Sequence, residues 1–357
     1  MRILHVITSL QTGGAEHLLV DLLPRLCAGG RNQVDLLVFN GEQTPFMGEL
    51  EEKHINIYKL TAGGNVYNPL NVFRITRYVM QYDILHTHNT ACQLFTPLAK
   101  LMSFTATPLV TTEHSSNNRR RSMWWCKPFD KWMYNRYAAV VCIADQPRHN
   151  LENHIGKKTN ICTIANGVDT QRFIRPIKDI SCKQNFVVTM VAGLRVEKDH
   201  ETLLKAMTYL PDIYSLQLVG GGVKDAELKT LTSQLGLDNR VSFLGVRLDV
   251  PDILEQSDVN VLSSHWEGLS LSSIEGMASG RPFIASDVDG LREVVGGAGV
   301  LFPHGDEKAL AKSIQHLCEH PDEYRQVAER CQQAARQYDI SVTAKKYLDL
   351  YSRLCGK

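Results

Sequence analysis

The chain has 357 residues, more than one hydrophobic core usually serves, so its length predicts two domains. Its 39 Lys and Arg residues balance 38 Asp and Glu residues, which argues against a general nucleic-acid binder. No apolar run approaches the roughly 20 residues of a membrane-spanning helix, so we expect a soluble protein.

The nine cysteines stand singly along the chain, and none forms a Cys-x-x-Cys pair. Because an odd number cannot pair fully within one chain, we expect reduced thiols and neither a disulfide framework nor a zinc site. The short apolar run near the N-terminus is interrupted by His5 and ends in Gly13 and Gly14, which predicts a buried strand and not a signal peptide. These features together predict a cytoplasmic protein.

Short β-branched runs alternate with longer amphipathic stretches through the first half of the chain. Val72, Ile75 and Val79, for example, recur at helical spacing and are expected to face a core. Strands are predicted at 2–8, 34–39, 55–60, 83–87, 108–112, 139–144 and 160–164, with helices between them that include 15–27, 69–81 and 91–103.

The second half repeats this alternation. Its predicted strands are 186–192, 215–220, 241–244, 258–263, 282–285 and 299–302. Its predicted helices are 199–208, 224–235, 249–256, 270–279 and 306–319. Continuously apolar strands that alternate with helices are typical of a parallel sheet covered on both faces, so the chain is predicted to be an α/β protein with two Rossmann-like domains.

The domain boundary is predicted at the turn signal Asn166 to Asp169, which follows a strand and precedes a polar segment. This boundary gives an N-terminal domain of residues 1–167 and a C-terminal domain of residues 168–338. Residues 339–357 are predicted to form a helix that packs onto a neighbouring domain through one apolar face, formed by Val342, Tyr347, Leu350, Tyr351 and Leu354.

The most informative segment is the loop Ser263 to Ser270, which joins an apolar strand to a helix. Ligands of open parallel sheets bind at the carboxyl ends of strands, and a helix N-terminus with free N–H groups suits a diphosphate. Glu267 in the loop and Glu275 in the helix offer acceptor atoms to the hydroxyls of a ribose or sugar. Two solvated surface acids are the alternative, which the apolar surroundings of Glu275 disfavour.

Arg195 and Lys198 follow the strand at 186–192 and could neutralise charge on a leaving diphosphate, the alternative being an ordinary solvated loop. Glycine turns at 13–14 and 220–222 also follow strands. Neither turn fits the Gly-x-Gly-x-x-Gly pattern of dinucleotide-binding proteins, so each is a weak indication by itself.

His86, His88 and His114 lie at the ends of two predicted strands. A His-x-His pattern is compatible with a metal site, but we expect only one of the first two histidines, His88, to face the site. Hydrogen-bonded histidines beneath a loop are the alternative for each.

Residues 117–137 carry six Lys or Arg residues against one Asp, beside several tryptophans. Pro128 could begin a helix that presents Phe129, Trp132, Met133 and Tyr137 on one side. Basic residues beside tryptophans suit an anionic membrane surface or a lipid-phosphate acceptor. The alternative is that the apolar side packs on the domain and that Arg119, Arg120 and Arg121 are merely solvated.

Over nearly its whole length the chain resembles the GT-B retaining glycosyltransferases of group 1 and family four. The spacing Glu267-x7-Glu275 is the most specific shared element. The other matching segments are 13–16, 83–88, 112–114, 166–169, 172–173, 197–198, 219–222, 243–245 and 290–293.

The resemblance implies two Rossmann-like domains that face each other across a cleft, one serving the acceptor and one the nucleotide-sugar donor, with the last helix crossing back to the N-terminal domain. It implies transfer of a sugar from a UDP- or, second, a GDP-sugar to a saccharide or lipid-linked acceptor, in the synthesis of surface polysaccharide or glycolipid. The anomeric configuration would be retained, and no metal or other cofactor would be needed.

The resemblance also assigns roles to individual residues. The catalytic set would be Lys198, Arg195, Glu267 and His114. Donor binding would use Gly14, Gly245, Val246, Arg247, Gly268, Leu269, Ser270 and Glu275, and the acceptor side would include His88, Arg119, Arg120 and Arg121. The family has an arginine five residues before this lysine, where the chain has Gly193, and Arg195 is the candidate substitute.

Two other classes of function remain at this point. A nucleotide-sugar epimerase or an NAD-dependent dehydrogenase could use a similar layered fold, although a dehydrogenase would be expected to carry the dinucleotide motif. A non-catalytic nucleotide-sugar-binding subunit is the other. Apart from the donor and acceptor, we expect no nucleic-acid partner, and we expect peripheral contact with the inner face of a membrane through 117–137.

Overall fold

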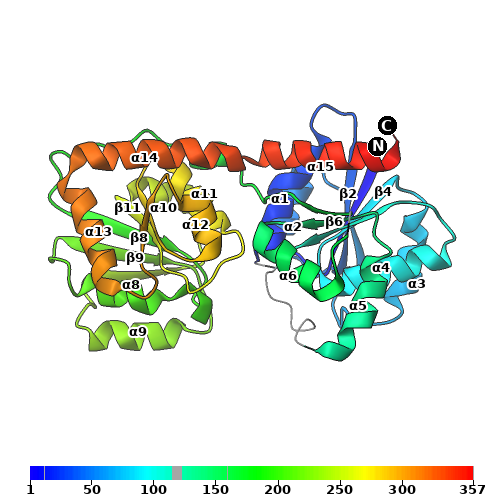
Figure 1. Cartoon of the computed structure of the whole chain (residues 1–357), viewed down its shortest axis with the longest axis horizontal. Coiled ribbons are helices and arrows are strands. Elements are labelled where there is room, and N and C mark those ends of the chain that lie inside the picture. The colour runs from blue at the N-terminus through cyan, green and yellow to red at the C-terminus, as the bar shows by residue number, and fades with distance from the viewer. Residues whose placement is uncertain (12, 115–122, 159, 357) are drawn as a thin grey trace. The chain divides into compact units, whose positions relative to one another are not determined.

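The computed structural model describes residues 1–11, 13–114, 123–158 and 160–356 (Figure 1). The chain divides into two compact units. Unit 1 comprises Met1–Gly167 together with Ile340–Lys357, and unit 2 comprises Val168–Asp339.

Unit 1 is built on a parallel sheet of seven strands in the order β3-β2-β1-β4-β5-β6-β7. The direction in which strands are added reverses between the neighbours β1 and β4, which makes the gap between these two strands the switch point of the sheet. The strands are β1 (Arg2–Ile7), β2 (Gln33–Asn40), β3 (Ile57–Thr61), β4 (Ile84–Thr87), β5 (Leu109–Glu113), β6 (Ala139–Cys142) and β7 (Ile161–Thr163).

Helices cover both faces of this sheet, so nearly all side chains of its central strands are buried, the polar ones included. One core contains apolar side chains of α1 (Gly14–Cys27), α2 (Pro45–Glu52) and α15 (Ile340–Cys355). The other core contains side chains of α3 (Asn71–Val79), α4 (Thr90–Met102), α5 (Lys127–Tyr134) and α6 (Asp145–Ile155). A short 3-10 helix, η2 (Trp124–Cys126), precedes α5.

The C-terminal helix α15 belongs to unit 1, as predicted (Figure 1). Tyr347, Leu350 and Tyr351 are buried in the same core as α1. The expected face was partly wrong, because Val342 is 38% exposed while Ile340 and Ala344 are buried. Val342 lies about 200° around the helix from Ile340, so the two side chains cannot share a face.

Unit 2 contains a second parallel sheet, of six strands in the order β10-β9-β8-β11-β12-β13. Its switch point lies between the neighbours β8 and β11. The strands are β8 (Phe186–Val191), β9 (Tyr214–Val219), β10 (Val241–Gly245), β11 (Val259–Leu262), β12 (Phe283–Ser286) and β13 (Val300–Phe302).

The helices of unit 2 alternate with these strands and are followed by a purely helical segment. They are α7 (Thr170–Phe173), η3 (Val196–Lys198), α8 (His200–Met207), α9 (Asp225–Gln234), α10 (Val250–Gln256), α11 (Leu271–Ala278), α12 (Asp289–Val295), α13 (Glu307–Glu319), α14 (Pro321–Ala335) and η4 (Arg336–Tyr338). The predicted fold class, two Rossmann-like α/β domains with a returning C-terminal helix, is confirmed.

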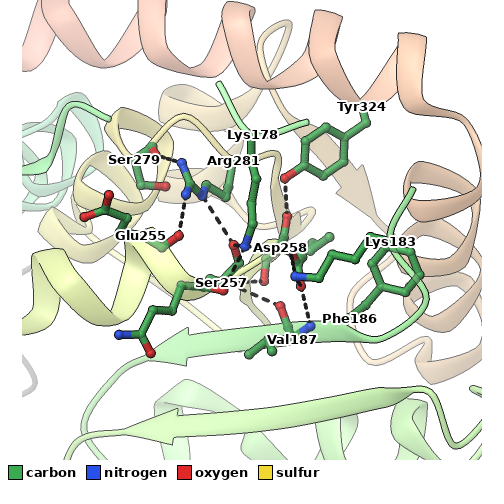
Figure 2. A network of polar contacts seen from close by, with 12 residues as sticks. Lys178, Lys183, Phe186, Val187, Glu255, Ser257, Asp258, Ser279, Arg281 and Tyr324 are labelled. Carbon is green, nitrogen blue, oxygen red and sulfur yellow. Dashed lines mark hydrogen bonds and ion pairs between the residues drawn. The ribbon is translucent and has the colours of Figure 1, made fainter. Parts of the chain in front are cut away.

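Figure 2 shows a buried polar network at the amino ends of β8 and β11. The carboxylate of Asp258 is fully buried, and Lys183 and Lys178 contact it at 2.5 and 2.8 Å. It also accepts the backbone N–H of Val187 at 2.7 Å. Donors from β8 and from the segment before it thus compensate the buried charge of Asp258. Ligand sites of such sheets lie at the opposite, carboxyl ends of the strands.

Among the helices that the structure describes, none combines the length and the apolar character that a membrane crossing requires.

Candidate functional site

Two of the four predicted catalytic residues, Lys198 and Glu267, lie together at the switch point of unit 2. Lys198 follows β8 and Glu267 follows β11, and these strands are neighbours in the sheet. The Nζ atom of Lys198 forms an ion pair with Oε1 of Glu267. Ser264 Oγ donates a hydrogen bond to the same carboxylate oxygen at 2.8 Å. The structure therefore brings a cation and an acid to the position where open α/β sheets bind ligands.

The loops that carry this pair are tied to each other by hydrogen bonds. The backbone N–H of His265 donates to the carbonyl of Glu197 at 2.8 Å. Ser263 Oγ donates to the carbonyl of Asp199 at 2.7 Å. Each bond joins the loop after β11 to the segment after β8, so the Lys198–Glu267 pair rests on a fixed backbone.

Helix α11 begins directly after this loop. The side chain of Ser270 caps the helix by accepting a hydrogen bond from the backbone N–H of Ser273 at 3.4 Å. Glu275 lies on this helix and is only 5% exposed, so it is not the solvated surface acid that was the alternative. Helical side chains lean toward the N-terminus, which directs Glu275 toward the end of α11 that adjoins the loop.

Gly268, the residue after Glu267, packs tightly against α12. A Cβ atom at Gly290 would lie 2.5 Å from the backbone oxygens of both Glu267 and Gly268. No side chain fits that space, so glycine at position 290 is what allows α12 to support the loop. Leu269, the next residue, is buried.

The side chain of Arg195 lies next to Gly193, the position at which the resembled family has its arginine. A Cβ atom at position 193 would lie 3.5 Å from Nε of Arg195. The guanidinium group also lies 3.9 Å from Glu197, and the side chain is 59% exposed. Thus the Arg195 side chain folds back over Gly193.

Three of the expected donor-binding residues, Gly245, Val246 and Arg247, lie at the end of β10 and directly after it. Gly245 has a φ of +67°, a conformation that favours glycine, and its carbonyl accepts a hydrogen bond from Gly220 N–H at 2.8 Å. Val246 is 67% exposed and lies next to Gly221. Arg247 makes a two-point ion pair with Asp249. These residues border the site through the glycine turn after β9.

A second cluster lies at the switch point of unit 1 and consists of histidines. His5 lies on β1, His88 follows β4 and His114 follows β5. Nδ1 of His5 is 2.8 Å from Nε2 of His88, and Nδ1 of His88 is 3.0 Å from Nε2 of His114. The three rings thus form one continuous hydrogen-bonded chain.

The expectation that only His88 of the His-x-His pair faces the site was wrong. His86 and His88 are both buried, and their ring centroids are 4.3 Å apart. The physical reason is that side chains two residues apart on a strand point to the same face.

His86 is held by hydroxyl groups. Its Nδ1 is 2.5 Å from the hydroxyl of Tyr351 on α15, and its Nε2 is 2.7 Å from the hydroxyl of Thr112. Thr112 in turn lies 3.0 Å from the hydroxyl of Tyr347. This arrangement matches the alternative of a hydrogen-bonded histidine.

Burial keeps the histidines of this cluster neutral. It lowers the pKa of His5 to about 3 and that of His114 to about 4. The pKa values of His86 and His88 are also lowered well below the ordinary value, first by burial and then by neighbouring histidines.

Two groups among the described residues could hold a metal ion by proximity: His5 with His86 and His88, and Asp199 with His265 and His304. In each group two ring nitrogens already lie at hydrogen-bonding distance. Nδ1 of His5 is 2.8 Å from Nε2 of His88, and Nδ1 of His265 is 2.7 Å from Nε2 of His304. Two nitrogens bound to one zinc ion at about 2.0–2.1 Å would be about 3.3 Å apart in a tetrahedral site. Both groups therefore have the geometry of hydrogen-bonded pairs.

Gly14 and Glu113 belong to the segments of unit 1 that match the resembled family. Gly14 is the first residue of α1, which follows β1, and a Cβ atom there would meet open space. Glu113, next to His114, is buried and accepts hydrogen bonds from Gln93 and Tyr134, both at 2.6 Å. The role of Glu113 is therefore structural.

Arg119, Arg120 and Arg121 lie outside the described residues. Downstream, Met133 and Tyr137 of the predicted apolar face are buried in the core, whereas Phe129 is 43% exposed. Trp124 is 85% exposed, and the neighbouring Lys127 and Lys131 are exposed as well.

His5 and Tyr351 were not predicted as site residues. His5 interrupts an otherwise apolar strand, which was the only indication in the sequence that it has a special environment.

Comparison with known proteins follows the same division of the chain. The family model described as glycosyltransferase family 4 matches residues 12–172, and the model described as glycosyl transferases group 1 matches residues 185–320. Together they span most of both units.

Three bacterial relatives have similar sequences. The chain is 28% identical to EpsD of Bacillus subtilis (strain 168), over 76% of this chain and 77% of that protein. It is 27% identical to the N,N'-diacetylbacillosaminyl-diphospho-undecaprenol alpha-1,3-N-acetylgalactosaminyltransferase of Campylobacter jejuni, over 61% of each. It is 31% identical to the UDP-Gal:alpha-D-GlcNAc-diphosphoundecaprenol alpha-1,3-galactosyltransferase of Escherichia coli, over 59% of each. The match thus spans about three-fifths of these last two proteins.

A solved structure has the same fold over nearly the whole chain. HepE from Anabaena, in complex with UDP and glucose, gives a TM-score of 0.85 at 23% identity, over 99% of this chain and 100% of that one.

Proposed function

The chain belongs to the glycosyltransferases of group 1 and family 4, and we propose that it transfers a sugar from a nucleotide-diphosphate donor to a lipid-linked saccharide. The observation that carries this proposal is the ion pair of Lys198 and Glu267 at the switch point of unit 2. A nucleotide-sugar brings negative phosphates and sugar hydroxyls, and this pair offers one group suited to each.

In the donor complex, Lys198 leaves the carboxylate and binds the diphosphate. The N-terminus of α11, with Ser270 at its cap, faces the same charge and contributes free backbone N–H groups. Glu267 then accepts hydrogen bonds from the transferred sugar, while Glu275 holds the ribose hydroxyls. Gly14 and the loop of Gly245, Val246 and Arg247 complete the donor set.

The proposed reaction retains the anomeric configuration and needs no metal. The bond from the anomeric carbon to the diphosphate breaks, and the acceptor hydroxyl forms the new bond on the same face of the sugar. The leaving phosphate oxygen takes the proton of that hydroxyl. Lys198 and Arg195 stabilise the charge that develops on the diphosphate. His114 contacts the transferred sugar, and His88 lies on the acceptor side.

The donor is proposed to be a UDP-sugar, with a GDP-sugar as the second candidate. The Escherichia coli relative is named for a UDP-galactose donor, and the HepE structure contains UDP. The acceptor is proposed to be a saccharide on diphospho-undecaprenol, as the names of the Campylobacter jejuni and Escherichia coli relatives suggest. The activity then belongs to the assembly of a surface polysaccharide or glycolipid.

A lipid-linked acceptor lies in a membrane, and we propose that unit 1 contacts the membrane surface through 117–137. In the described part of this segment, the exposed side chains of Trp124 and Phe129 lie next to the exposed cations Lys127 and Lys131. Its one acid, Asp130, is buried and bonded to His154 at 2.9 Å, so it does not offset the cations at the surface. An apolar and basic surface of this kind binds anionic lipids.

A panel of UDP- and GDP-sugars tests the donor by thermal shift, since a ligand that binds the folded state raises the melting temperature. Transfer is then measured with the stabilising sugar and synthetic diphospho-undecaprenyl saccharides. Conversion of the donor to another nucleotide-sugar without acceptor would indicate an epimerase. Binding without transfer or slow donor hydrolysis would indicate a non-catalytic subunit.

A further inference from the structure

The chain His5–His88–His114 has a polar atom without a partner at each end. Among the described residues, Nε2 of His5 and Nδ1 of His114 are buried nitrogens that form no hydrogen bond. Both links between the rings are made by ring nitrogens alone. The protons of the three rings are therefore coupled, and the state of one end determines the state of the other.

The geometry supports real hydrogen bonds along the chain. The planes of His5 and His88 are inclined by only 11° and the ring centroids are 5.1 Å apart, which fits rings that meet edge to edge at the 2.8 Å link. The planes of His88 and His114 are inclined by 37°. In each link one nitrogen must donate and the other must accept, and a neutral ring carries a single N–H group.

Only two arrangements of protons satisfy both links with neutral rings. In the first, every ring carries its proton on Nε2, His114 donates to His88, and His88 donates to His5. In the second, every ring carries its proton on Nδ1, His5 donates to His88, and His88 donates to His114. A cationic His88 would carry an N–H group on both nitrogens. In either arrangement one of these groups would face the N–H group of a neighbouring ring, unless that neighbour changed tautomer.

The two arrangements differ in where an N–H group is left without an acceptor. The first leaves it at Nε2 of His5, on a strand residue with no exposed surface. The second leaves it at Nδ1 of His114. This nitrogen is buried too, but it belongs to a partly exposed residue at the carboxyl end of β5, the end where ligands of such sheets bind. An orphaned N–H in a protein interior is rare and costly, whereas the oxygen of a ligand bound at this end of the sheet can accept the proton of His114.

We propose that His5, His88 and His114 all carry their proton on Nδ1, and that His5 and His88 are positioning residues that keep Nδ1 of His114 a hydrogen-bond donor. This inference rests on the proposed function in one respect, the identity of the acceptor atom as an oxygen of the transferred sugar. The three histidines then favour a sugar that has a hydroxyl oxygen within reach of Nδ1 of His114. His86 is not part of the chain, because hydroxyl groups engage both of its nitrogens.

The tautomers are measured directly by 15N NMR of histidine side chains in the full chain at neutral pH, since the nitrogen shift distinguishes N–H from a lone pair. Single variants His5→Asn, His88→Asn and His114→Asn assign the signals. The expected result is a proton on Nδ1 in all three neutral rings. A proton on Nε2 of any of the three, or a cationic ring, would overturn the proposal.

Kinetics test the positioning role. An asparagine side-chain N–H can replace Nδ1–H of His5, whereas leucine has no donor. We therefore expect kcat/KM of His5→Asn to stay within about threefold of the parent value and kcat/KM of His5→Leu to fall about tenfold. The affinity for UDP alone should not change in either variant. Equal kcat/KM in His5→Leu and the parent would contradict the role. If the parent chain itself neither binds nor transfers a nucleotide-sugar, the proposed function fails while the tautomer assignment is still tested by NMR.

Discussion

Lys198 and Glu267 are 69 residues apart in the sequence and form an ion pair between the loops that follow β8 and β11. Their neighbouring strands flank the switch point of the C-terminal sheet, so the topology alone brings these loops together. The pair also suggests a switch of partners. Without donor, the lysine neutralises the acid, and with donor, each group can bind a different part of the nucleotide-sugar.

Glu275 is expected to hold the donor through two hydroxyl groups of the ribose. Glu275→Ala should therefore lower kcat/KM by about 100-fold or more, mostly through a higher KM for the donor, because two hydrogen bonds to a carboxylate are lost. The matched control is Glu319→Ala, which removes an exposed acid of the same unit. Steady-state kinetics of both variants with intact folding check this. Near-parental rates for Glu275→Ala would remove it from the donor site.

Arg195 is expected to replace the arginine that the family has at position 193. Arg195→Ala should lose roughly tenfold to 100-fold in kcat, because one cation near the leaving diphosphate is lost. A Cβ atom at Gly193 would meet only ordinary contacts, at 3.5 Å or more, and two of its three nearest atoms belong to the Arg195 side chain that the second substitution removes. The double variant Gly193→Arg with Arg195→Ala should thus recover most of the activity. Failure of Arg195→Ala to reduce the rate would show that the exposed guanidinium has no part in catalysis.

The buried histidines predict that unit 1 loses stability in mild acid. Burial lowers the pKa of His5 from 6.5 to about 3 in the folded chain. As the pH falls, His5 therefore binds a proton in the unfolded chain before it does so in the folded chain. The stability that this group contributes is present above pH 6.5 and is lost as the pH falls toward 3. At pH 5 the loss from His5 alone is about 2 kcal/mol.

Urea unfolding at pH 7.5 and 5.0 measures this loss. His5→Asn should show a smaller difference between the two pH values than the parent, although it is less stable at pH 7.5. The control His149→Asn removes an exposed histidine of α6 and should keep the parental difference. An unchanged difference in His5→Asn would mean that His5 does not titrate as its burial implies.

Unit 1 is expected to bind vesicles that contain phosphatidylglycerol more strongly than vesicles of phosphatidylcholine alone. Trp124→Ala should weaken binding about fivefold or more, because an exposed aromatic side chain that can enter the interface is lost. The pair Lys127→Ala with Lys131→Ala should weaken binding about 30-fold, since each cation near an anionic surface contributes about 1 kcal/mol. Trp266→Ala, which removes another exposed tryptophan, is the control. Co-sedimentation measures the bound fraction. Equal loss in the control would argue against a specific surface.

The fold, and the places of Glu267 and Glu275 within it, were predictable because their patterns are local. Each strand and helix is marked by the spacing of its own apolar residues, and Glu267 and Glu275 lie within one loop and the helix that follows. The contact of Lys198 with Glu267 follows from the order of strands once two Rossmann-like sheets are recognised.

The histidine chain could not be predicted in this way. Its members come from three strands of unit 1, and His86 is bonded to Tyr351, 265 residues further on. No local pattern encodes such pairs. The error about His86 and His88 had a different cause, since the period of a strand places both on one face. The Asp258 network was also unforeseen, because its partners Lys178 and Lys183 lie in a polar segment without periodic pattern.

We propose that the site around Lys198 transfers a sugar from a nucleotide-diphosphate donor. The most direct measurement is the transfer of labelled sugar to a diphospho-undecaprenyl saccharide by the parent, by Lys198→Ala and by the control Lys205→Ala, an exposed lysine of α8. We predict transfer by the parent and the control, and a loss of about 100-fold or more in Lys198→Ala, since a cation at the leaving group is removed. Parental rates in a folded Lys198→Ala variant would contradict the account.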